Sequence, residues 1–349
     1  MTPPPHLPAP GPPRSPWQRL YGAAHAWRRR RAARTARHLP RPVVSLGNLH
    51  WGGTGKTPLV AAIAGHLERS GRRVVILSRG YRGAARSPLL VSRGDGPRVG
   101  PEVAGDEPVA LALALPGVAV VVGRDRHAAG LLALADLRPA PELFLLDDGF
   151  SHVRLARDLD LLALPDVDPW GGGRLPPGGR LREPLASARH AHALLLTGTT
   201  ASPASAGEVA HALAVFGFAG RGFAAPTRFG VPRLAADGQP LPPTARLFLV
   251  AAIARPERLR AAAAGMGLQE VGSLVFPDHH PYPPRSLRAI ERDFAAAGAE
   301  AVLTTAKDQV KLAGRLALPL AVLPVAAEPE PPFWTWLDAA LDGLTEPAA

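Results

Sequence analysis

The sequence predicts an α/β protein built from two domains, and three observations support this prediction. First, short apolar runs alternate along the chain with segments that have helical periodicity. Second, these runs are apolar throughout and are bounded by turn residues, which is typical of strands buried on both faces of a parallel sheet. Third, a chain of 349 residues is long enough for two hydrophobic cores of ordinary size.

The N-terminal part divides into a tail and a helix. Residues 1–16 are rich in proline and are predicted to be disordered. An apolar stripe with helical spacing then marks residues 17–41, and it consists of Trp17, Leu20, Tyr21, Ala24 and Trp27. Arginines cluster behind this stripe, and the segment is neither a signal peptide nor long and apolar enough to span a membrane. We predict an amphipathic helix in the interface of an anionic membrane, and a helix packed on its own domain is the alternative.

Residues 42–199 are predicted to form the first domain, a doubly wound layer of strands and helices. A helix over residues 57–71 has Val60, Ile63 and Leu67 on one face, and Gly71 suits its C-terminal end. Residues 168–184 are too rich in glycine and proline for an element interior and form a functional loop or a linker. The strands are expected at 42–48, 74–80, 118–123, 143–149, 159–165 and 192–198.

Residues 200–349 repeat the alternation and are predicted to form a second, smaller α/β domain. The apolar runs that we expect to be its strands lie at residues 246–253, 271–276, 301–308 and 318–325. No internal repeat is evident, so the two domains are not predicted to be copies of one unit.

Composition limits the classes of partner. The net charge of +11 favours anionic partners, such as a phosphorylated substrate or an anionic membrane surface. Aromatic residues make up only 5% of the chain and do not alternate with the basic ones, so we expect no nucleic-acid partner. The sequence contains no cysteine, which excludes disulfides, thiolate metal ligands and a cysteine nucleophile.

The segment "GGTGKT" (52–57) lies between a predicted strand and a predicted helix. Its glycines allow backbone N–H groups to turn toward a phosphate, Lys56 can contact the terminal phosphates, and the Thr57 hydroxyl can face a magnesium ion. His50 stands where the usual pattern has its outermost glycine. The strand and helix around the loop nevertheless predict a P-loop NTPase-like parallel sheet that binds a nucleotide.

Two further segments can complete such a site. The strand at 143–149 leads into Asp147 and Asp148, which can hold magnesium beside a phosphate loop but in isolation would indicate only a turn. "GDEP" (105–108) contains Asp106, a carboxylate that could accept the proton of an attacking hydroxyl. "FPDHHPY" (276–282) has two histidines, which could assist that carboxylate, bind a metal or belong to a polar loop.

Taken together, the motifs resemble one family. In chain order they are "GNLHWGGTGKTP", "ILSRGYRG", "GDEP", "LLDDGF.H", "LPPGGRLREP", "FPDHHPY" and "LTTAKDQVKL". This series resembles the tetraacyldisaccharide 4'-kinases of lipid A biosynthesis, in which the outermost glycine of the loop is also missing, and the resemblance extends from about residue 17 to residue 325. The resemblance implies transfer of a phosphoryl group from ATP to the 4'-hydroxyl of a tetraacyldisaccharide 1-phosphate, giving lipid IVA.

The resemblance also implies an architecture and a place in the cell. It implies two α/β/α domains joined by a two-stranded linker, with an N-terminal helix on the membrane. The enzyme is then expected on the cytoplasmic face of the bacterial inner membrane, as a monomer that contacts its lipid substrate and the anionic membrane surface.

The resemblance assigns roles to particular residues. Asp106 would pair with His279 to activate the sugar hydroxyl, while Arg182, Lys307 and Lys311 would lie near anionic groups of ATP or lipid. The expected ATP-binding residues are His50, Trp51, Gly52, Gly53, Thr54, Gly55, Lys56 and Thr57. The expected Mg²⁺ ligands are Thr57, Asp147, Asp148 and Glu107.

The chain departs from the family pattern in two places. Ser151 replaces a glutamine of the family, and the N-terminal helix is shorter and richer in arginine, which favours peripheral attachment over a true span.

Other functions fit the sequence less well. A partitioning ATPase or nucleotide switch would share the loop, but Trp51 stands where such ATPases often have a lysine. A kinase or ligase of a small molecule would leave the N-terminal helix unexplained, and a non-enzymatic membrane module would not need the phosphate loop.

Overall fold

The large sheet is mostly parallel, with one antiparallel strand at each edge. The computed structural model describes residues 16–176 and 178–345, so the tail predicted for 1–16 lies, apart from Pro16, outside the described residues. The sheet runs β14 (Val325–Ala327), β8 (Arg221–Phe229), β7 (Ala193–Gly198), β6 (Leu159–Pro165), β1 (Val43–Gly47), β5 (Leu143–Asp147), β2 (Val74–Ser78), β4 (Ala119–Val122) and β3 (Leu89–Arg93). Only the β3–β4 and β14–β8 pairs are antiparallel in this sheet of the described chain.

Helices cover both faces of this sheet, which explains why its central strands are apolar throughout. One face packs on α2 (Lys56–Arg69), α4 (Asp106–Ala114) and α10 (Pro331–Thr345). The other face packs on α5 (Arg126–Asp136) and α6 (Pro203–Leu213). Successive residues of β1 illustrate the alternation, since Val43 contributes to one core and Val44 to the other. The predicted doubly wound layer is confirmed.

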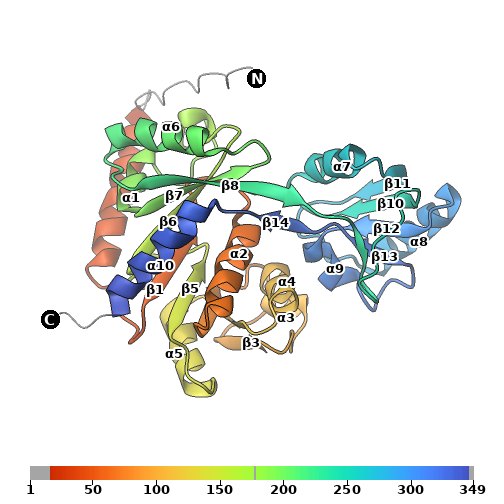
Figure 1. Cartoon of the computed structure of the whole chain (residues 1–349), viewed down its shortest axis with the longest axis horizontal. Helices are drawn as coiled ribbons and strands as arrows, with labels where there is room; N and C mark the ends of the chain where they lie inside the picture. Colours follow the sequence, from red (N-terminus) through yellow and green to blue (C-terminus); the bar gives the residue numbers. More distant parts are fainter. Residues whose placement is uncertain (1–15, 177, 346–349) are drawn as a thin grey trace.

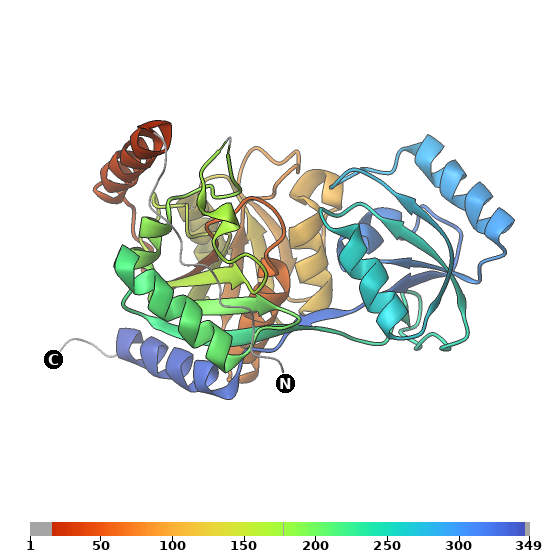
Figure 2. The same ribbon diagram turned by 90° about the horizontal axis from the view of Figure 1, so that it is seen from above.

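A second, smaller sheet forms the other lobe, as Figure 2 shows. Its strands run in the order β11 (Gln269–Val275), β10 (Arg246–Ala251), β12 (Ala301–Thr304), β13 (Leu320–Val322) and β9 (Arg233–Leu234). The helix α7 (Pro256–Gly265) packs on one face, while α8 (Pro284–Ala297) and α9 (Ala306–Leu312) pack on the other. Both lobes are therefore α/β/α layers.

Two antiparallel strands join the lobes. β8 pairs with β7 in its first part and with β14 in its last part, and the two strands pass together between the lobes (Figure 1). β14 returns the chain to the large sheet, and α10 then packs on α2 through His66 and Asp338, whose side chains are 3.1 Å apart. The connection implied by the family resemblance is thus formed by β8 and β14.

The structure corrects the domain boundary expected at residue 200. The helix α6, the strands β8 and β14 and the helix α10 all belong to the first lobe, because residues of each bury their apolar side chains in its cores. The strand expected at 318–325 is two strands in different sheets, β13 and β14, separated at Pro324, which lacks the N–H that a continuous ladder needs. The strand expected at 301–308 ends at Thr304, since Thr305 caps α9 by accepting a hydrogen bond from the Asp308 amide.

Shorter elements complete the first lobe and correct two other expectations. The helix α1 (Pro16–Ala33) ends well before residue 41. Residues 168–184 do not connect the lobes but fold over the "GGTGKT" loop and contain a short 3-10 turn, η1 (Gly171–Gly173). The remaining elements are α3 (Pro101–Ala104), η2 (Leu185–His190) and η3 (Ala214–Phe216).

The position of α10 gives a prediction about stability. Phe333 is fully buried and packs edge-to-face on Phe223 of β8, with ring centroids 5.5 Å apart. We expect Phe333→Ala to lower the free energy of unfolding by about 3–5 kcal/mol, because it leaves a cavity between α10 and the large sheet. Urea denaturation followed by circular dichroism measures this. Leu344→Ala is the control, since Leu344 is 37% exposed on the same helix. Equal losses for both variants would contradict the packing described here.

Candidate active site

The loop between β1 and α2 has the geometry of a phosphate cradle. Gly52 and Gly55 adopt φ values of 99° and 74°, the left-handed region that glycine occupies without strain. The loop is held in place through Thr54: the Asn48 side-chain amide donates to its hydroxyl at 2.7 Å, and the Thr197 hydroxyl donates to its carbonyl at 2.7 Å. The loop enters α2 at Lys56, so backbone N–H groups of the first helical turn remain free to bind an anion.

Cations converge on Asp148 beside this loop. Lys56 Nζ lies 3.5 Å from Asp148 Oδ1, and Arg182 donates two hydrogen bonds to the carboxylate at 2.7 and 2.9 Å. Burial alone would raise the pKa of Asp148, but Lys56 and Arg182 outweigh it and lower the pKa. The sequence places Arg182 near ATP or lipid, whereas here its partners are Asp148 and the Asn48 carbonyl.

The segment 168–184 covers the entrance to the loop. The Trp51 amide donates to the Arg180 carbonyl at 2.8 Å, and His50 forms an antiparallel bridge with Leu181. The His50 side chain is buried, and a Cβ on Gly171 would lie only 2.6 Å from its ring. Burial lowers the pKa of His50 to about 4, so the ring is neutral at physiological pH. His50 thus packs under the covering segment, while the Trp51 side chain is exposed.

Asp147 is the buried carboxylate at the end of β5. The Ser78 hydroxyl, at the end of the neighbouring β2, donates to it at 3.0 Å. Burial, together with the negative charges of Glu107 and Asp148, raises the pKa of Asp147 to about 6. A buried carboxylate that two other carboxylates repel is chemically suited to a hard cation with oxygen ligands.

The four predicted metal ligands are not gathered into one cluster. Within residues 16–176 and 178–345, no group of three or more His, Cys, Asp or Glu side chains could hold a metal ion. Asp148 is paired with Arg182 and Lys56, and Glu107 is paired with Lys307. The oxygen donors Thr57 and Asp147 fit a magnesium ion, whereas Asp148 and Glu107 would first have to leave their cationic partners.

Asp106 and His279 meet across the two lobes. Asp106 is buried at the first turn of α4, and His279 Nδ1 lies 2.8 and 3.0 Å from its two carboxylate oxygens. His279 has a φ of 61°, in the left-handed region that is uncommon for residues other than glycine. The hydrogen bond that His279 donates to the Asp106 carboxylate raises the pKa of His279, despite partial burial.

The neighbouring residue, His280, has different contacts. His280 Nε2 lies 2.9 Å from the Ser286 hydroxyl, and the His280 ring stacks on Phe276 at 4.6 Å between centroids. These partners belong to its own lobe, and none of them is a carboxylate. The structure therefore brings His279, and not His280, to Asp106.

Both lysines of α9 contact carboxylates of α4. Lys307 donates to Glu107, and Lys311 Nζ lies 3.5 Å from Asp106 Oδ2 and 2.8 Å from Asp308 Oδ1. The resemblance places these lysines near anionic groups of ATP or lipid, but in this structure they join α9 of the second lobe to α4 of the first. Burial alone would raise the pKa of Asp106, but the hydrogen bond from His279 and, after it, the charges of His279, Lys311 and Lys307 lower it.

The segment 79–83 holds His279 from the other side. The Arg82 guanidinium donates to the Asp278 carbonyl at 3.1 Å, and the Tyr81 ring meets the His279 ring edge-on, with centroids 5.3 Å apart.

At the position of the family glutamine, the Ser151 hydroxyl donates to Glu183, and the Arg29 guanidinium donates to the same carboxylate at 3.2 Å. The departure at Ser151 is thus accommodated through Glu183.

Sequence reasoning missed several residues that hold the site together. The sequence could have identified Asn48, Ser78 and Thr197 as site residues. Each is at or beside the C-terminal end of a predicted parallel strand, where ligands bind in such sheets. No sequence feature identifies Arg126 as a site residue, since the first turn of a surface helix is an ordinary place for arginine. It is buried near Asp147 and Asp148, and burial lowers its pKa to about 10.

Three features together define a nucleotide-dependent phosphotransferase of the P-loop class. They are a glycine-rich loop at a helix N-terminus, a strand-end aspartate and a buried carboxylate–histidine pair. The sequence profile of the family described as "Tetraacyldisaccharide-1-P 4'-kinase" matches residues 14–342. The chain belongs to this family.

Individual relatives agree with this membership. The chain is 41% identical to a tetraacyldisaccharide 4'-kinase of Geobacter sulfurreducens, with 93% of this chain and 88% of the relative covered. It is 37% identical to a protein of the same name from Chromobacterium violaceum, with 92% and 90% covered. A crystal structure of LpxK from Aquifex aeolicus in complex with ATP superimposes with a TM-score of 0.72 at 31% identity, covering 93% of this chain and 98% of that one.

Proposed function

We propose that this chain transfers the terminal phosphoryl group of ATP to the 4'-hydroxyl of a tetraacyldisaccharide 1-phosphate. The family membership supports the reaction, and the similar structure from Aquifex aeolicus binds ATP. The observation that carries the proposal within this chain is the contact between Asp106 and His279 at 2.8 Å. An ATPase or a nucleotide switch activates water and needs no acid–base pair supplied jointly by two lobes, whereas a kinase must hold an acceptor hydroxyl in line.

Each group has a distinct task in this proposal. Backbone N–H groups of residues 52–57 and the Lys56 ammonium hold the β- and γ-phosphates and stabilise the charge that spreads over the transferred group. Asp106 accepts the proton of the sugar hydroxyl, and His279 orients the carboxylate and shares that proton. His50 supports the loop from below rather than contacting the nucleotide, because its ring is buried against Gly171.

Mg²⁺ is proposed as the metal, with Thr57 and Asp147 as the residues that would hold it. When bound, the ion would neutralise phosphate charge and align the terminal phosphoryl group. The roles of Asp148 and Glu107 as ligands depend on release from Arg182 and Lys307, and we propose that a bound nucleotide competes for these two cations, since its phosphates carry more charge than a carboxylate.

A transfer assay tests the function. The purified chain is incubated with γ-labelled ATP, magnesium and the tetraacyldisaccharide 1-phosphate in detergent micelles, and the lipid and aqueous phases are counted separately. We expect label in the lipid phase and little free phosphate. Release of label only as inorganic phosphate would instead support a hydrolase or a switch.

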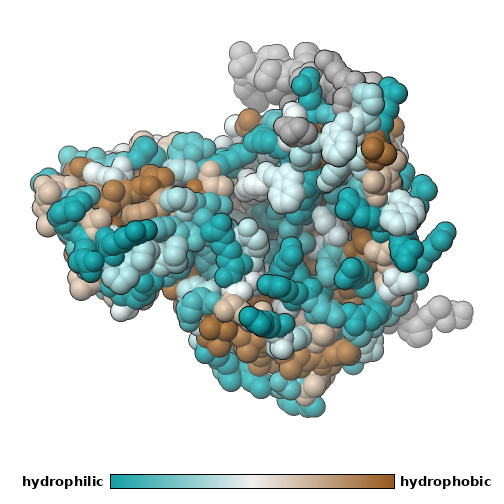
Figure 3. All heavy atoms as spheres, turned by 180° about the vertical axis from the view of Figure 1, so that it is seen from behind, coloured by the Kyte–Doolittle hydropathy of each residue, from teal (hydrophilic) through white to brown (hydrophobic). Residues whose placement is uncertain are grey.

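The outer face of α1 supports attachment to a membrane surface. Of the predicted apolar stripe, Trp17, Leu20 and Trp27 are 55%, 63% and 61% exposed, whereas Tyr21 packs against a core of the first lobe. None of the helices within the described residues has the length and apolar character to cross a bilayer. The face seen in Figure 3 is largely hydrophilic, with hydrophobic residues in separate patches. We propose peripheral binding through α1 to the cytoplasmic face of the inner membrane, where anionic lipids attract its arginines.

The membrane proposal predicts the behaviour of a triple variant. Replacing Trp17, Leu20 and Trp27 with serine should move most of the protein from the membrane pellet to the supernatant, because each buried aromatic or aliphatic side chain contributes about 1.5–3 kcal/mol. Fractionation of cells followed by immunoblotting measures the shift. A variant with Leu113→Ser and Leu131→Ser is the control, since these exposed side chains lie on α4 and α5. No shift in the triple variant would exclude α1 as the attachment site.

Two further proposals concern assembly and partners. We propose that the chain acts as a monomer, because both halves of its site, Asp106 and His279, come from one chain. The excess of basic residues is proposed to serve ATP, the lipid phosphate and the membrane surface rather than nucleic acid.

A further inference from the structure

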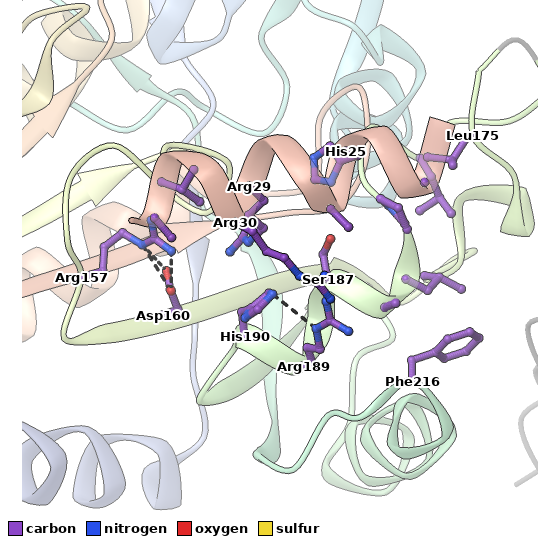
Figure 4. Close-up of a pocket in the computed structure, with 18 of the residues that line it drawn as sticks. His25, Arg29, Arg30, Arg157, Asp160, Leu175, Ser187, Arg189, His190 and Phe216 are labelled. Atoms are coloured by element: carbon purple, nitrogen blue, oxygen red, sulfur yellow. Dashed lines mark hydrogen bonds and ion pairs between the residues drawn. The ribbon is translucent and has the colours of Figure 1, made fainter. Parts of the chain in front are cut away.

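A cavity of about 660 Å³ lies between α1 and the first lobe, outside the candidate active site. Its floor is formed by residues 153–157, Asp160 and η2, and its roof is one face of α1 (Figure 4). This volume falls within the range of about 300–1,000 Å³ that is usual for small-molecule sites. None of the residues assigned above to ATP, to the acceptor hydroxyl or to magnesium lines it.

The side of α1 that faces the cavity is polar. Gln18, Gly22, His25 and Arg29 recur at helical spacing along this side, and all four line the cavity. A helix that packs on its own domain normally turns its apolar stripe inward, but here Trp17, Leu20 and Trp27 point outward. Gly22 also leaves the roof open, since the nearest atom to a Cβ there would be Pro184 Cγ at 3.7 Å. The polar side of α1 therefore suits a ligand with polar groups.

Positive charge in the cavity exceeds negative charge. The lining includes five arginines and a single carboxylate, Asp160, which Arg157 already engages at 2.9 Å. For Arg19, Arg30 and Arg189 the described residues provide no ion-pair partner. Arg29 is buried and its Nη1 pairs with Glu183, which does not line the cavity, while its Nη2 has no hydrogen-bond acceptor among the described residues. Burial, with the nearby charges of Arg29 and Arg189, lowers the pKa of His190 to about 4. An anion would relieve this imbalance.

The two ends of the cavity differ in character. In Figure 4, Arg157 and Asp160 lie at one end and Leu175 and Phe216 at the other, with Arg189 and His190 between them. Leu181 and Leu185 extend the apolar end. A small inorganic anion would leave this apolar half unused, whereas a molecule with a charged head and a hydrocarbon chain would fill both halves.

We propose that this cavity binds one anionic glycerophospholipid of the bilayer. Its phosphate contacts Arg30 and Arg189, and part of one acyl chain lies along Leu175, Leu185 and Phe216. The proposal rests on the proposed membrane contact of α1, whose exposed tryptophans bring the cavity to the level of the lipid headgroups. Such a lipid would hold α1 against the lobe in a fixed orientation.

Binding of a soluble lipid tests the proposal without a membrane. Isothermal titration calorimetry with dihexanoyl phosphatidylglycerol, kept below its micelle concentration, is carried out on the full chain, and dihexanoyl phosphatidylcholine serves as the uncharged comparison. We expect saturable binding of one phosphatidylglycerol and at least about tenfold weaker binding of phosphatidylcholine. Equal affinity for the two lipids would overturn the role of the arginines.

Two matched pairs of variants locate the binding. Gly22→Phe fills the cavity and Arg30→Glu reverses its charge, while Ala23→Phe and Arg28→Glu make the same changes on exposed positions of α1 outside the lining. We expect about a tenfold or greater loss of affinity for the first member of each pair and less than about twofold for the second. Equal losses within a pair would show diffuse attraction to the surface and overturn the proposal. Circular dichroism confirms that each variant is folded.

Two outcomes separate this inference from the proposed function. Lys56→Ala is expected to lose phosphoryl transfer but to bind phosphatidylglycerol unchanged. A chain that phosphorylates the disaccharide lipid and binds no phosphatidylglycerol would overturn the cavity proposal alone. Competitive displacement of phosphatidylglycerol by the disaccharide 1-phosphate would also overturn it, since the cavity would then belong to the substrate site.

Discussion

Lys56→Ala is expected to reduce kcat by at least about 10³-fold, to the limit of detection. Lys56 is the first residue of α2 and lies 3.5 Å from Asp148, so its ammonium is at the loop that we propose holds the terminal phosphates of a nucleotide. Removing it takes away a fixed charge that is needed most when negative charge spreads over the transferred group. Steady-state transfer of label to the lipid measures the effect.

The fold should survive this change. Arg182 still holds Asp148 through two hydrogen bonds, so the carboxylate is not left unpaired. Lys56→Arg is the informative companion, because a guanidinium keeps the charge but cannot occupy the same compact position. We expect it to restore little activity. Turnover within about tenfold of the unaltered chain in Lys56→Ala would mean that the loop does not hold the reacting phosphates.

Asp106→Asn is expected to lower kcat by about 10²–10⁴-fold while the affinity for ATP stays nearly unchanged. The amide keeps the shape of the side chain but cannot accept a proton from the sugar hydroxyl. Asp106 is the first residue of α4 and is not part of the phosphate loop that precedes α2, so the contacts that hold the nucleotide should persist in this variant. Single-turnover transfer and titration with a fluorescent ATP analogue measure the two quantities.

The pairing with His279 adds a second criterion. Because the two side chains act as a unit, Asp106→Asn combined with His279→Gln should cost little more than Asp106→Asn alone. His280→Gln is the control, since His280 contacts Ser286 rather than Asp106, and it should reduce kcat by less than about fivefold. Additive losses for Asp106 and His279, or full activity of Asp106→Asn, would rule out the assigned pair.

The fold of the first lobe could be predicted from sequence because its strands are buried on both faces. Each gives a continuous apolar run, and the six expected there match β1, β2, β4, β5, β6 and β7 to within two residues at either end. The boundary between the lobes could not be found in this way. β14 and α10 return to the large sheet after the second lobe is complete, and a local pattern does not record which core a segment joins.

The residues of the candidate site show the same contrast between local patterns, which the sequence reveals, and long-range contacts, which it does not. The phosphate loop and Asp147 are local signals, since each depends on residues adjacent to a strand. The contact of Asp106 with His279 spans 173 positions. The sequence pattern offers either histidine of "FPDHHPY" as a partner of Asp106, and only the family resemblance selects His279. The partners of Lys307 and Lys311 could not be anticipated, because a lysine is equally suited to a phosphate and to a carboxylate, and the choice depends on how α9 docks on α4.

The position of the new phosphate on the product tests the central claim most directly. After reaction of the purified chain with ATP and the tetraacyldisaccharide 1-phosphate, the extracted lipid is analysed by ³¹P–¹H correlation NMR. Our account predicts a second phosphomonoester signal that correlates with the proton on carbon 4' and is much weaker after the same reaction time with Asp106→Asn. A new phosphorus signal coupled instead to the existing 1-phosphate, or no new signal while ATP is consumed, would contradict it.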